Sequence, residues 1–365
     1  MCNVSSRILS ILHFIYVRGV NSSDQEQGSM VGHFPEKAVH GGKVQELRRI
    51  FGHDFLDVSA SMNPFVPQVR ADFSCADLSR YPDDSYTELK EIIARVFSRS
   101  IDEICLGNGS AELIRVYCHT VLSRGDTAQI DPPTFAEYGL SAELAGAAVL
   151  PGTRLGDRVP AVRFICNPNN PTGHLLSRDV MLTELDRCTK TGTQLFVDEA
   201  FMDLSCPEDS ITDVLSDNLF VMRSLTKSFA VPGIRFGFGF GSPDLIEQIE
   251  TARTPWTINA FAEYYAKLAF AHYHELRGAA ERIAAEREWY YTRLDELGLS
   301  YERSAVNYIL IHLNRSAAAF TRAMIDQGVL VRDCTSFGLP ECIRVSVETR
   351  ERNVRVLEAV AACLR

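Results

Sequence analysis

Three short apolar segments constrain the fold of this chain more than any other feature. They are VRFICN (162–167), QLFVD (194–198) and LFVMR (219–223), and the helical pattern RDVMLTELDRCTK (178–190) separates the first two. Strands without a polar face are buried on both sides, which requires a parallel sheet covered by helices. The sequence therefore predicts an α/β domain.

Further periodic segments extend this pattern in both directions. Before the three strands, ELKEIIARVF (88–97) and FAEYGLSAELA (135–145) predict helices, and DTAQID (126–131) predicts a strand. After them, ELRGAAERIAAEREWYYTRLDELG (275–298) predicts a long helix that Gly298 ends. NYILIHL, SAAAFTRAMIDQG and IRVSVE then alternate between strand and helix. We predict a segment that joins the small domain over 30–80, a large domain over 81–274, and a small α+β domain over 275–365.

The overall charge narrows the choice of partner. The chain of 365 residues has a formal net charge of −10, which repels nucleic acid and anionic membrane surfaces. A small molecule is the better expectation. The ten cysteines form no CxxC pair and the nine histidines form no ligand pattern, so we expect reduced thiols, a cytoplasmic location and no metal site.

The N-terminus departs from this ordinary composition. RILSILHFIYV (7–17) is apolar but too short to span a bilayer, and no clear cleavage site follows it. We interpret residues 1–29 as a tail. A cleaved signal or a membrane anchor is the alternative, and Met30 as the true start is another.

Polar clusters follow several of the predicted strands, where open α/β sheets bind ligands. In LGNGSAELIRVY, Gly107 and Gly109 bracket a turn and Ser110 opens a helix, whose free N–H groups suit a phosphate. A plain strand-to-helix turn explains this cluster equally well. In CNPNNPTG, two prolines and a glycine hold Asn170 in a rigid loop, although an ordinary turn rich in asparagine is the alternative.

Two more clusters carry charged side chains at strand ends. In VDEAFMD, Asp198 ends an apolar strand, where a carboxylate requires a cation or a donor, or else caps the next helix. In RSLTKSFAVPGIRFGFGFG, Lys227 lies among small hydroxyl and apolar residues. A buried lysine without a partner is costly, so we expect this lysine to have a function.

Together these clusters match what a pyridine ring with a phosphate and an aldehyde requires. Such a ring needs an anion cradle, a carboxylate at its nitrogen and a lysine that binds the aldehyde. The candidates are Gly109, Ser110, Ser224 and Arg235 for the cradle, Asp198 for the ring nitrogen, Lys227 for the aldehyde and Asn170 for the ring oxygen.

From HGG at His40 to the C-terminus, these motifs resemble the fold-type I, pyridoxal-phosphate-dependent aminotransferase superfamily, class I/II. The resemblance implies a mostly parallel seven-stranded sheet flanked by helices. It also implies pyridoxal 5′-phosphate bound covalently by Lys227 in SLTKS, and the same roles for the residues just named.

The resemblance adds residues that the clusters alone do not give. Phe135 in PPTFAEY matches the aromatic residue that stacks on the ring face, and Arg344 in IRVSV matches the arginine that grips the substrate α-carboxylate. Tyr81 in RYPD matches the residue that reaches the neighbouring subunit's cofactor, which implies a homodimer with shared sites.

Two groups within the superfamily share this length and these motifs: histidinol-phosphate aminotransferases and threonine-phosphate decarboxylases of the cobalamin pathway. The segments HGG, SASMNP, FAEY, RSLTKSFAVPGIR and PWTINAFA look more like the decarboxylase. Many aminotransferases have tyrosine after DEA, whereas this chain has Phe201. The resemblance thus favours decarboxylation of L-threonine O-3-phosphate, with transamination of histidinol phosphate as the alternative.

Both groups act on phosphorylated amino compounds, so a second anion site is expected. Arg332, with Asn63 and His40, is the candidate, and a surface or interdomain ion pair is the alternative for this arginine. A nicotinamide dehydrogenase is a poor match, because GFGFG is not a G-x-G-x-x-G motif that opens a helix. A regulator that retains the fold without catalysis would lose some of the cofactor residues, and Lys227, Asp198, Asn170 and Arg235 are all present.

Overall fold

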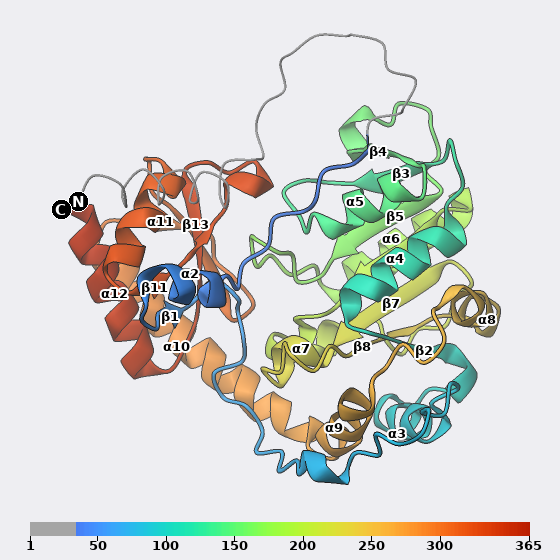
Figure 1. The fold of residues 1–365 in the computed structure, drawn as a ribbon. Helices are drawn as coiled ribbons and strands as arrows, with labels where there is room; N and C mark the ends of the chain where they lie inside the picture. The colour runs from blue at the N-terminus through green and yellow to red at the C-terminus, as the bar shows by residue number, and fades with distance from the viewer. Residues whose placement is uncertain (1–33) are drawn as a thin grey trace.

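The computed structural model describes residues 34–365, which form two lobes joined by one long helix (Figure 1). The larger lobe contains a seven-stranded sheet of order β2-β8-β7-β6-β5-β3-β4. Its neighbouring strands are parallel except at β8, which runs antiparallel to both β2 and β7. The predicted mostly parallel seven-stranded sheet is confirmed. The strands are β2 (Ile104–Gly107), β3 (Thr127–Ile130), β4 (Ala148–Leu150), β5 (Val162–Cys166), β6 (Gln194–Asp198), β7 (Leu219–Ser224) and β8 (Gly237–Phe240).

Helices cover both faces of this sheet, which explains its continuous apolar strands. Along β6, Phe196 packs into a cluster with α4, α5 and α8, while Leu195 and Val197 pack on the opposite face against α6. Helices α3 and α9 cover the end of the sheet formed by β2 and β8. The helices are α3 (Thr87–Phe97), α4 (Ser110–Val121), α5 (Glu137–Leu144), α6 (Arg178–Thr191), α7 (Leu225–Ser228), α8 (Pro243–Ala252) and α9 (Ala260–Ala271).

The smaller lobe is built on a four-stranded antiparallel sheet of order β12-β13-β10-β9. Helix α10 begins with Leu276 in the core of the larger lobe and ends with Tyr290 and Leu294 in the core of the smaller one. The division at residue 275 stays a prediction. The elements are α10 (Leu276–Glu296), β9 (Ser300–Tyr301), β10 (Tyr308–His312), α11 (Ala317–Asp326), β11 (Val329–Leu330), β12 (Arg332–Asp333), β13 (Cys342–Ser346) and α12 (Arg350–Leu364).

The first described segment, residues 34–57, contributes a helix and a strand to the smaller lobe, as Figure 1 shows in blue. Helix α2 (Val44–Phe51) packs through Leu47 on Ile325 and Leu330, and β1 (Leu56–Asp57) pairs in parallel with β11. The predicted tail over residues 1–29 lies outside the described residues.

Within residues 34–365, no helix is long and apolar enough to cross a membrane. In the same residues, no three histidine, cysteine or acidic side chains are arranged to hold a metal ion.

Candidate functional site

The register of the large sheet brings several predicted site segments to one edge. Because β8 runs against its neighbours, its first residue, Gly237, pairs with Gly107 at the end of β2 and with Ser224 at the end of β7. On the other side of β7, β6 ends at Asp198, which pairs with Met222. The segments that follow β2, β6 and β7 and the segment that precedes β8 therefore meet at this edge.

An anion cradle forms where α4 begins. Gly109 has φ of 80° and ψ of 161°, and a Cβ atom there would lie 2.5 Å from Nη2 of Arg235. A Cβ atom on Gly237 would lie 2.7 Å from the backbone nitrogen of Ser110. Glycine at these two positions lets the guanidinium and the start of the helix approach closely. Backbone N–H groups at a helix start beside an arginine favour a bound phosphate.

Ser224 links this cradle to the turn that carries the lysine. Its Oγ accepts a hydrogen bond from the backbone nitrogen of Thr226 at 3.2 Å and so caps the single turn of α7. The cap fixes the start of that turn, three residues before Lys227. Ser224 and Lys227, which are predicted to contact the phosphate and the aldehyde, therefore lie at the end of one strand and on the turn that follows it.

The Lys227 amine lies in surroundings that disfavour its charge. Nζ donates to the carbonyl of Ala60 at 2.8 Å and lies 5.7 Å from the ring centroid of Phe201. Burial, followed by the nearby charges of Arg344 and Arg235, lowers the pKa of Lys227 to about 7. A large fraction of the amine is therefore unprotonated at neutral pH, which is the nucleophilic form.

Asp198 is a buried carboxylate held by two donors. Its Oδ2 accepts from the Tyr138 hydroxyl at 2.6 Å, and its Oδ1 accepts from the backbone nitrogen of Ala200 at 2.9 Å. Burial raises the pKa of Asp198 to about 6, although both hydrogen bonds oppose the rise. A cation bound beside this carboxylate would favour its ionised form.

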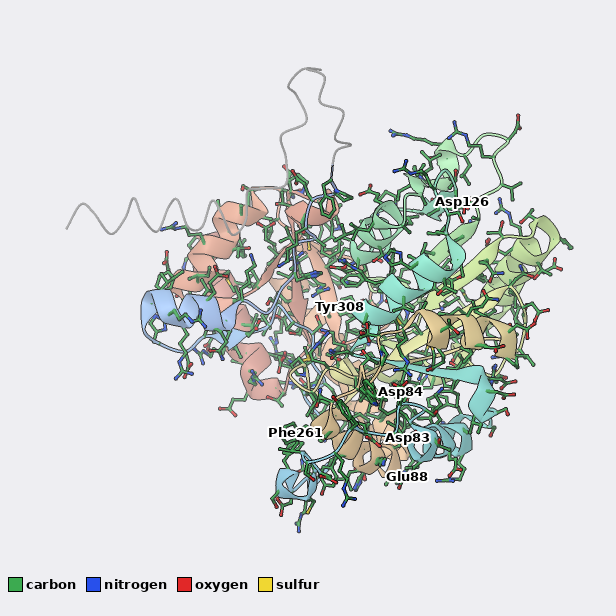
Figure 2. All side chains as sticks on the ribbon, turned by 45° about the vertical axis from the view of Figure 1, so that its right-hand side comes forward. Asp83, Asp84, Glu88, Asp126, Phe261 and Tyr308 are labelled. Atoms are coloured by element: carbon green, nitrogen blue, oxygen red, sulfur yellow. The ribbon has the colours of Figure 1, made fainter. Side chains whose placement is uncertain are left out.

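Residues of both lobes meet around Arg344 on β13. Its guanidinium donates to Oδ1 of Asn170 and, at 2.8 Å, to the carbonyl of Ser59. It also lies 4.8 Å from the ring centroid of Tyr308, whose hydroxyl donates to the carbonyl of Asn169 at 2.8 Å. Figure 2 shows Tyr308 where the two lobes meet. The predicted α-carboxylate arginine and the predicted ring-oxygen asparagine are thus in direct contact.

Phe135 lies beside the first described segment. Its ring centroid is 5.8 Å from that of His40, whose Nε2 lies 2.7 Å from Oε1 of Glu137. Arg115 donates to the other oxygen of Glu137 at 3.1 Å. The hydrogen bond from His40 is the largest of the causes that lower the pKa of Glu137. The structure therefore brings His40 to the aromatic residue that the resemblance places on the ring face.

Arg332 is buried next to this segment. It donates to the carbonyl of Val39 at 2.8 Å and to the Ser336 hydroxyl at 2.7 Å. In the register of β12 and β13, Arg332 pairs with Arg344, and cross-strand partners place their side chains on the same face of a sheet. The two arginines are therefore neighbours.

Asn63 makes backbone contacts around the lysine turn. Its Nδ2 donates to the carbonyl of Ser228 at 2.8 Å, and its Oδ1 accepts from the backbone nitrogen of Phe65 at 2.8 Å. Its backbone nitrogen donates to the carbonyl of Lys227 at 3.0 Å. These contacts hold the chain after Ala60 against the lysine turn. A contact of Asn63 with the substrate phosphate stays a prediction.

Tyr81 lies on the surface. Its side chain is 80% exposed, and its ring centroid is 4.5 Å from that of Trp256. A contact between Tyr81 and a neighbouring subunit stays a prediction.

The donor set fits pyridoxal 5′-phosphate. The cradle at Gly109 and Arg235 offers N–H groups and a positive charge to the phosphate. Lys227 has the lowered pKa that suits bonding to an aldehyde, and Asp198 is a buried carboxylate that a cationic ring nitrogen would stabilise.

Two residues of the site were missed in the sequence. Tyr138 and Glu137 follow Phe135 in FAEY, which predicted only the start of a helix and the family resemblance. Phe135 precedes α5, which begins at Glu137, and its ring centroid lies 5.5 Å from that of Tyr138. The contact of Tyr138 with Asp198 depends on the fold, and no local pattern indicates it.

Known proteins resemble this chain over most of its length. The family model for aminotransferase class I and II matches residues 65–360. The histidinol-phosphate aminotransferase of Symbiobacterium thermophilum is 31% identical over 345 residues, which cover 89% of this chain and 95% of that protein. The threonine-phosphate decarboxylase of Salmonella typhimurium is 30% identical over 350 residues, which cover 88% of this chain and 96% of that protein. The crystal structure of the histidinol-phosphate aminotransferase from Clostridium acetobutylicum superposes with a TM-score of 0.77 at 26% identity over 84% of this chain and 98% of that chain.

Proposed function

This chain belongs to the class I and II aminotransferase family, whose cofactor is pyridoxal 5′-phosphate, and from that premise we propose that it decarboxylates L-threonine O-3-phosphate. The bond between Cα and the carboxylate breaks, CO₂ leaves, and one proton is added at Cα. The product is (R)-1-aminopropan-2-yl phosphate. A threonine-phosphate decarboxylase among the relatives at 30% identity supports this reaction.

The environment of Phe201 is the observation that carries the proposal. The ring is 6% exposed and packs edge-on against Tyr308 with centroids 5.1 Å apart, while Nζ of Lys227 lies 5.7 Å from its centroid. Where many aminotransferases offer a phenol hydroxyl, this site offers only an apolar face. The loss of that donor should change the electronics of the bound cofactor, in line with a different reaction.

The substrate groups have clear partners in this proposal. Arg344 binds the α-carboxylate, and its contacts with Asn170 and Ser59 fix its orientation. Arg332, with His40 beside it on the first described segment, binds the substrate phosphate. Two charged ends held by neighbouring arginines leave the substrate little freedom to rotate at Cα.

The bound cofactor supplies an electron sink for the bond that breaks at Cα. Arg344 selects that bond by orienting the carboxylate. Lys227, with a pKa of about 7, exchanges a proton near neutral pH with little cost, so it returns the proton to Cα after CO₂ has left. In a transamination the same amine would instead remove the Cα proton.

Transamination of histidinol phosphate is the second candidate. It is favoured by the histidinol-phosphate aminotransferase at 31% identity. The same lysine, aspartate and arginines would serve it. We also propose that the enzyme is a cytoplasmic homodimer in which Tyr81 of one subunit reaches the cofactor of the other.

The two reactions are separated by their products. We expect CO₂ release from L-threonine O-3-phosphate without an amino acceptor, and little glutamate from histidinol phosphate and 2-oxoglutarate. Arg332→Ala should weaken substrate binding by about 2–5 kcal/mol while retaining the cofactor, because it removes a buried charged donor. Arg315→Ala, an exposed arginine of the same lobe, is the control and should bind substrate normally. Glutamate formation with no CO₂ would establish the aminotransferase instead.

A further inference from the structure

A buried ion network adjoins the cofactor site and has no part in the mechanism above. Arg223, which precedes Ser224 on β7, donates to Oε2 of Glu199 at 2.8 Å and to Oδ1 of Asp203. The three charged side chains are at most 4% exposed. One guanidinium thus joins two carboxylates that both belong to the segment after β6.

Glu199 is fully engaged by donors. Besides Arg223, it accepts from the Ser210 hydroxyl at 2.5 Å, the backbone nitrogen of Ile211 at 3.0 Å and the Thr212 hydroxyl at 3.0 Å. A buried carboxylate with four donors, one of them a cation, is held in one place.

Asp203 connects the network to the start of α10, the helix that joins the two lobes. Asp203 accepts from the Tyr273 hydroxyl at 2.6 Å, and Arg223 donates to that hydroxyl at 3.1 Å. Tyr273 lies three residues before α10, which begins at Leu276. The network therefore fixes the segment from Asp198 to Asp203 on both sides.

The network and the cofactor residues alternate along two adjacent strand ends. Glu199 directly follows Asp198, and Arg223 directly precedes Ser224. The backbone nitrogen of Glu199 also donates to the carbonyl of Met222 at 2.8 Å, which joins the two ends. We propose that Arg223 is a positioning residue for the cofactor: through Glu199 and Asp203 it holds the turn that carries Asp198 and sets the electrostatic environment of that carboxylate.

Glu199 is the residue through which the charge of Arg223 affects Asp198. Besides its burial, the groups that bear on Asp198 are the backbone nitrogen of Ala200 and the side chains of Tyr138, Cys166, Glu199, Lys227 and Tyr308. Among them, Glu199 is a like charge that raises the pKa of Asp198. Arg223 offsets this charge. Without Arg223, Glu199 would keep only its neutral donors, and its uncompensated charge beside Asp198 would favour the protonated form of Asp198.

The bound cofactor reports this effect through its colour. Ionised Asp198 would keep the ring nitrogen of the cofactor protonated, and the protonated ring withdraws electrons. This withdrawal lowers the pKa of the lysine nitrogen that is bonded to the cofactor. Arg223→Met should therefore move the midpoint of the absorbance titration of that bond to higher pH by about one unit, and should weaken cofactor binding at least tenfold. Arg223→Lys, which retains the charge, should restore most of both. Glu199→Gln removes the like charge and should move the midpoint the other way.

Arg253→Met is the matched control. Arg253 is also buried and also pairs with two carboxylates, Glu250 and Asp84, but it lies outside this network. This variant should lose thermal stability with an unchanged midpoint. The proposal rests on the family cofactor and not on the reaction, so a normal cofactor spectrum with the wrong products leaves it intact. It is overturned if Arg223→Met behaves like Arg253→Met, or, where Arg223→Met does not fold, if Glu199→Gln leaves the midpoint in place.

Discussion

Replacing Asp198 with asparagine should stabilise the protein without its cofactor. In the folded chain, burial raises the pKa of this carboxyl from 3.8 to about 6. Below pH 3.8 the group is neutral in both states. Between the two values the unfolded chain has lost the proton that the folded chain still holds, so stability falls as the pH rises and then levels off above pH 6.

The size of the stability loss follows from the size of the pKa change of Asp198. A rise of about two pKa units corresponds to ~3 kcal/mol, which the folded cofactor-free protein loses between pH 3.8 and pH 7. Asparagine resembles the neutral carboxyl in shape and cannot ionise. It can still accept from Tyr138 or Ala200 through its one oxygen. Asp198→Asn should therefore avoid most of that loss.

The assay is urea unfolding of cofactor-free protein at several pH values from 4.5 to 8. The difference in unfolding free energy between Asp198→Asn and the unchanged protein should grow toward ~3 kcal/mol by pH 7 and then remain constant. Asp54→Asn is the control, because that side chain is 75% exposed and solvent screens its charge, so this substitution should change the unfolding free energy little at pH 7. A flat difference for Asp198→Asn, or one that falls with rising pH, would refute the reasoning.

Two further predictions concern the cofactor. The purified protein should absorb as a pyridoxal adduct of lysine, and Lys227→Ala should abolish the borohydride-reducible bond to the protein; retention of that bond in the variant would remove Lys227 from its role. A mixture of inactive Tyr81→Ala and inactive Lys227→Ala chains should recover part of the activity, because some hybrid dimers hold one intact site. Hybrids that form but remain inactive would count against a shared site.

The large lobe was predictable because its strands are apolar on both faces. The segments 162–167, 194–198 and 219–223 could satisfy that pattern only in a helix-covered sheet, and the structure places β5, β6 and β7 there side by side. The contact of Asn170 with Arg344 could not be predicted in the same way. The two residues are 174 positions apart, and no local pattern encodes how the lobes meet.

The site was predictable where a strand end determines a side chain's place. Asp198 and Lys227 have such positions. Asn63 does not: its amide could have faced a substrate phosphate or the backbone, and the structure shows it bonded to Ser228 and Phe65. The network around Arg223 was missed because arginine and glutamate on adjacent strands become partners only once the register is known.

The reversed direction of β8 also has a consequence for synthesis of the chain. Strand β2 pairs only with β8 in the large sheet, and 130 residues separate Gly107 from its partner Gly237. At translation rates of about 5–20 residues per second, β2 waits roughly 6–26 s for that partner. During this time its unpaired backbone N–H and C=O groups and its apolar side chains are open to other chains. The newly made chain should therefore depend on protection from aggregation until residue 240 has left the ribosome.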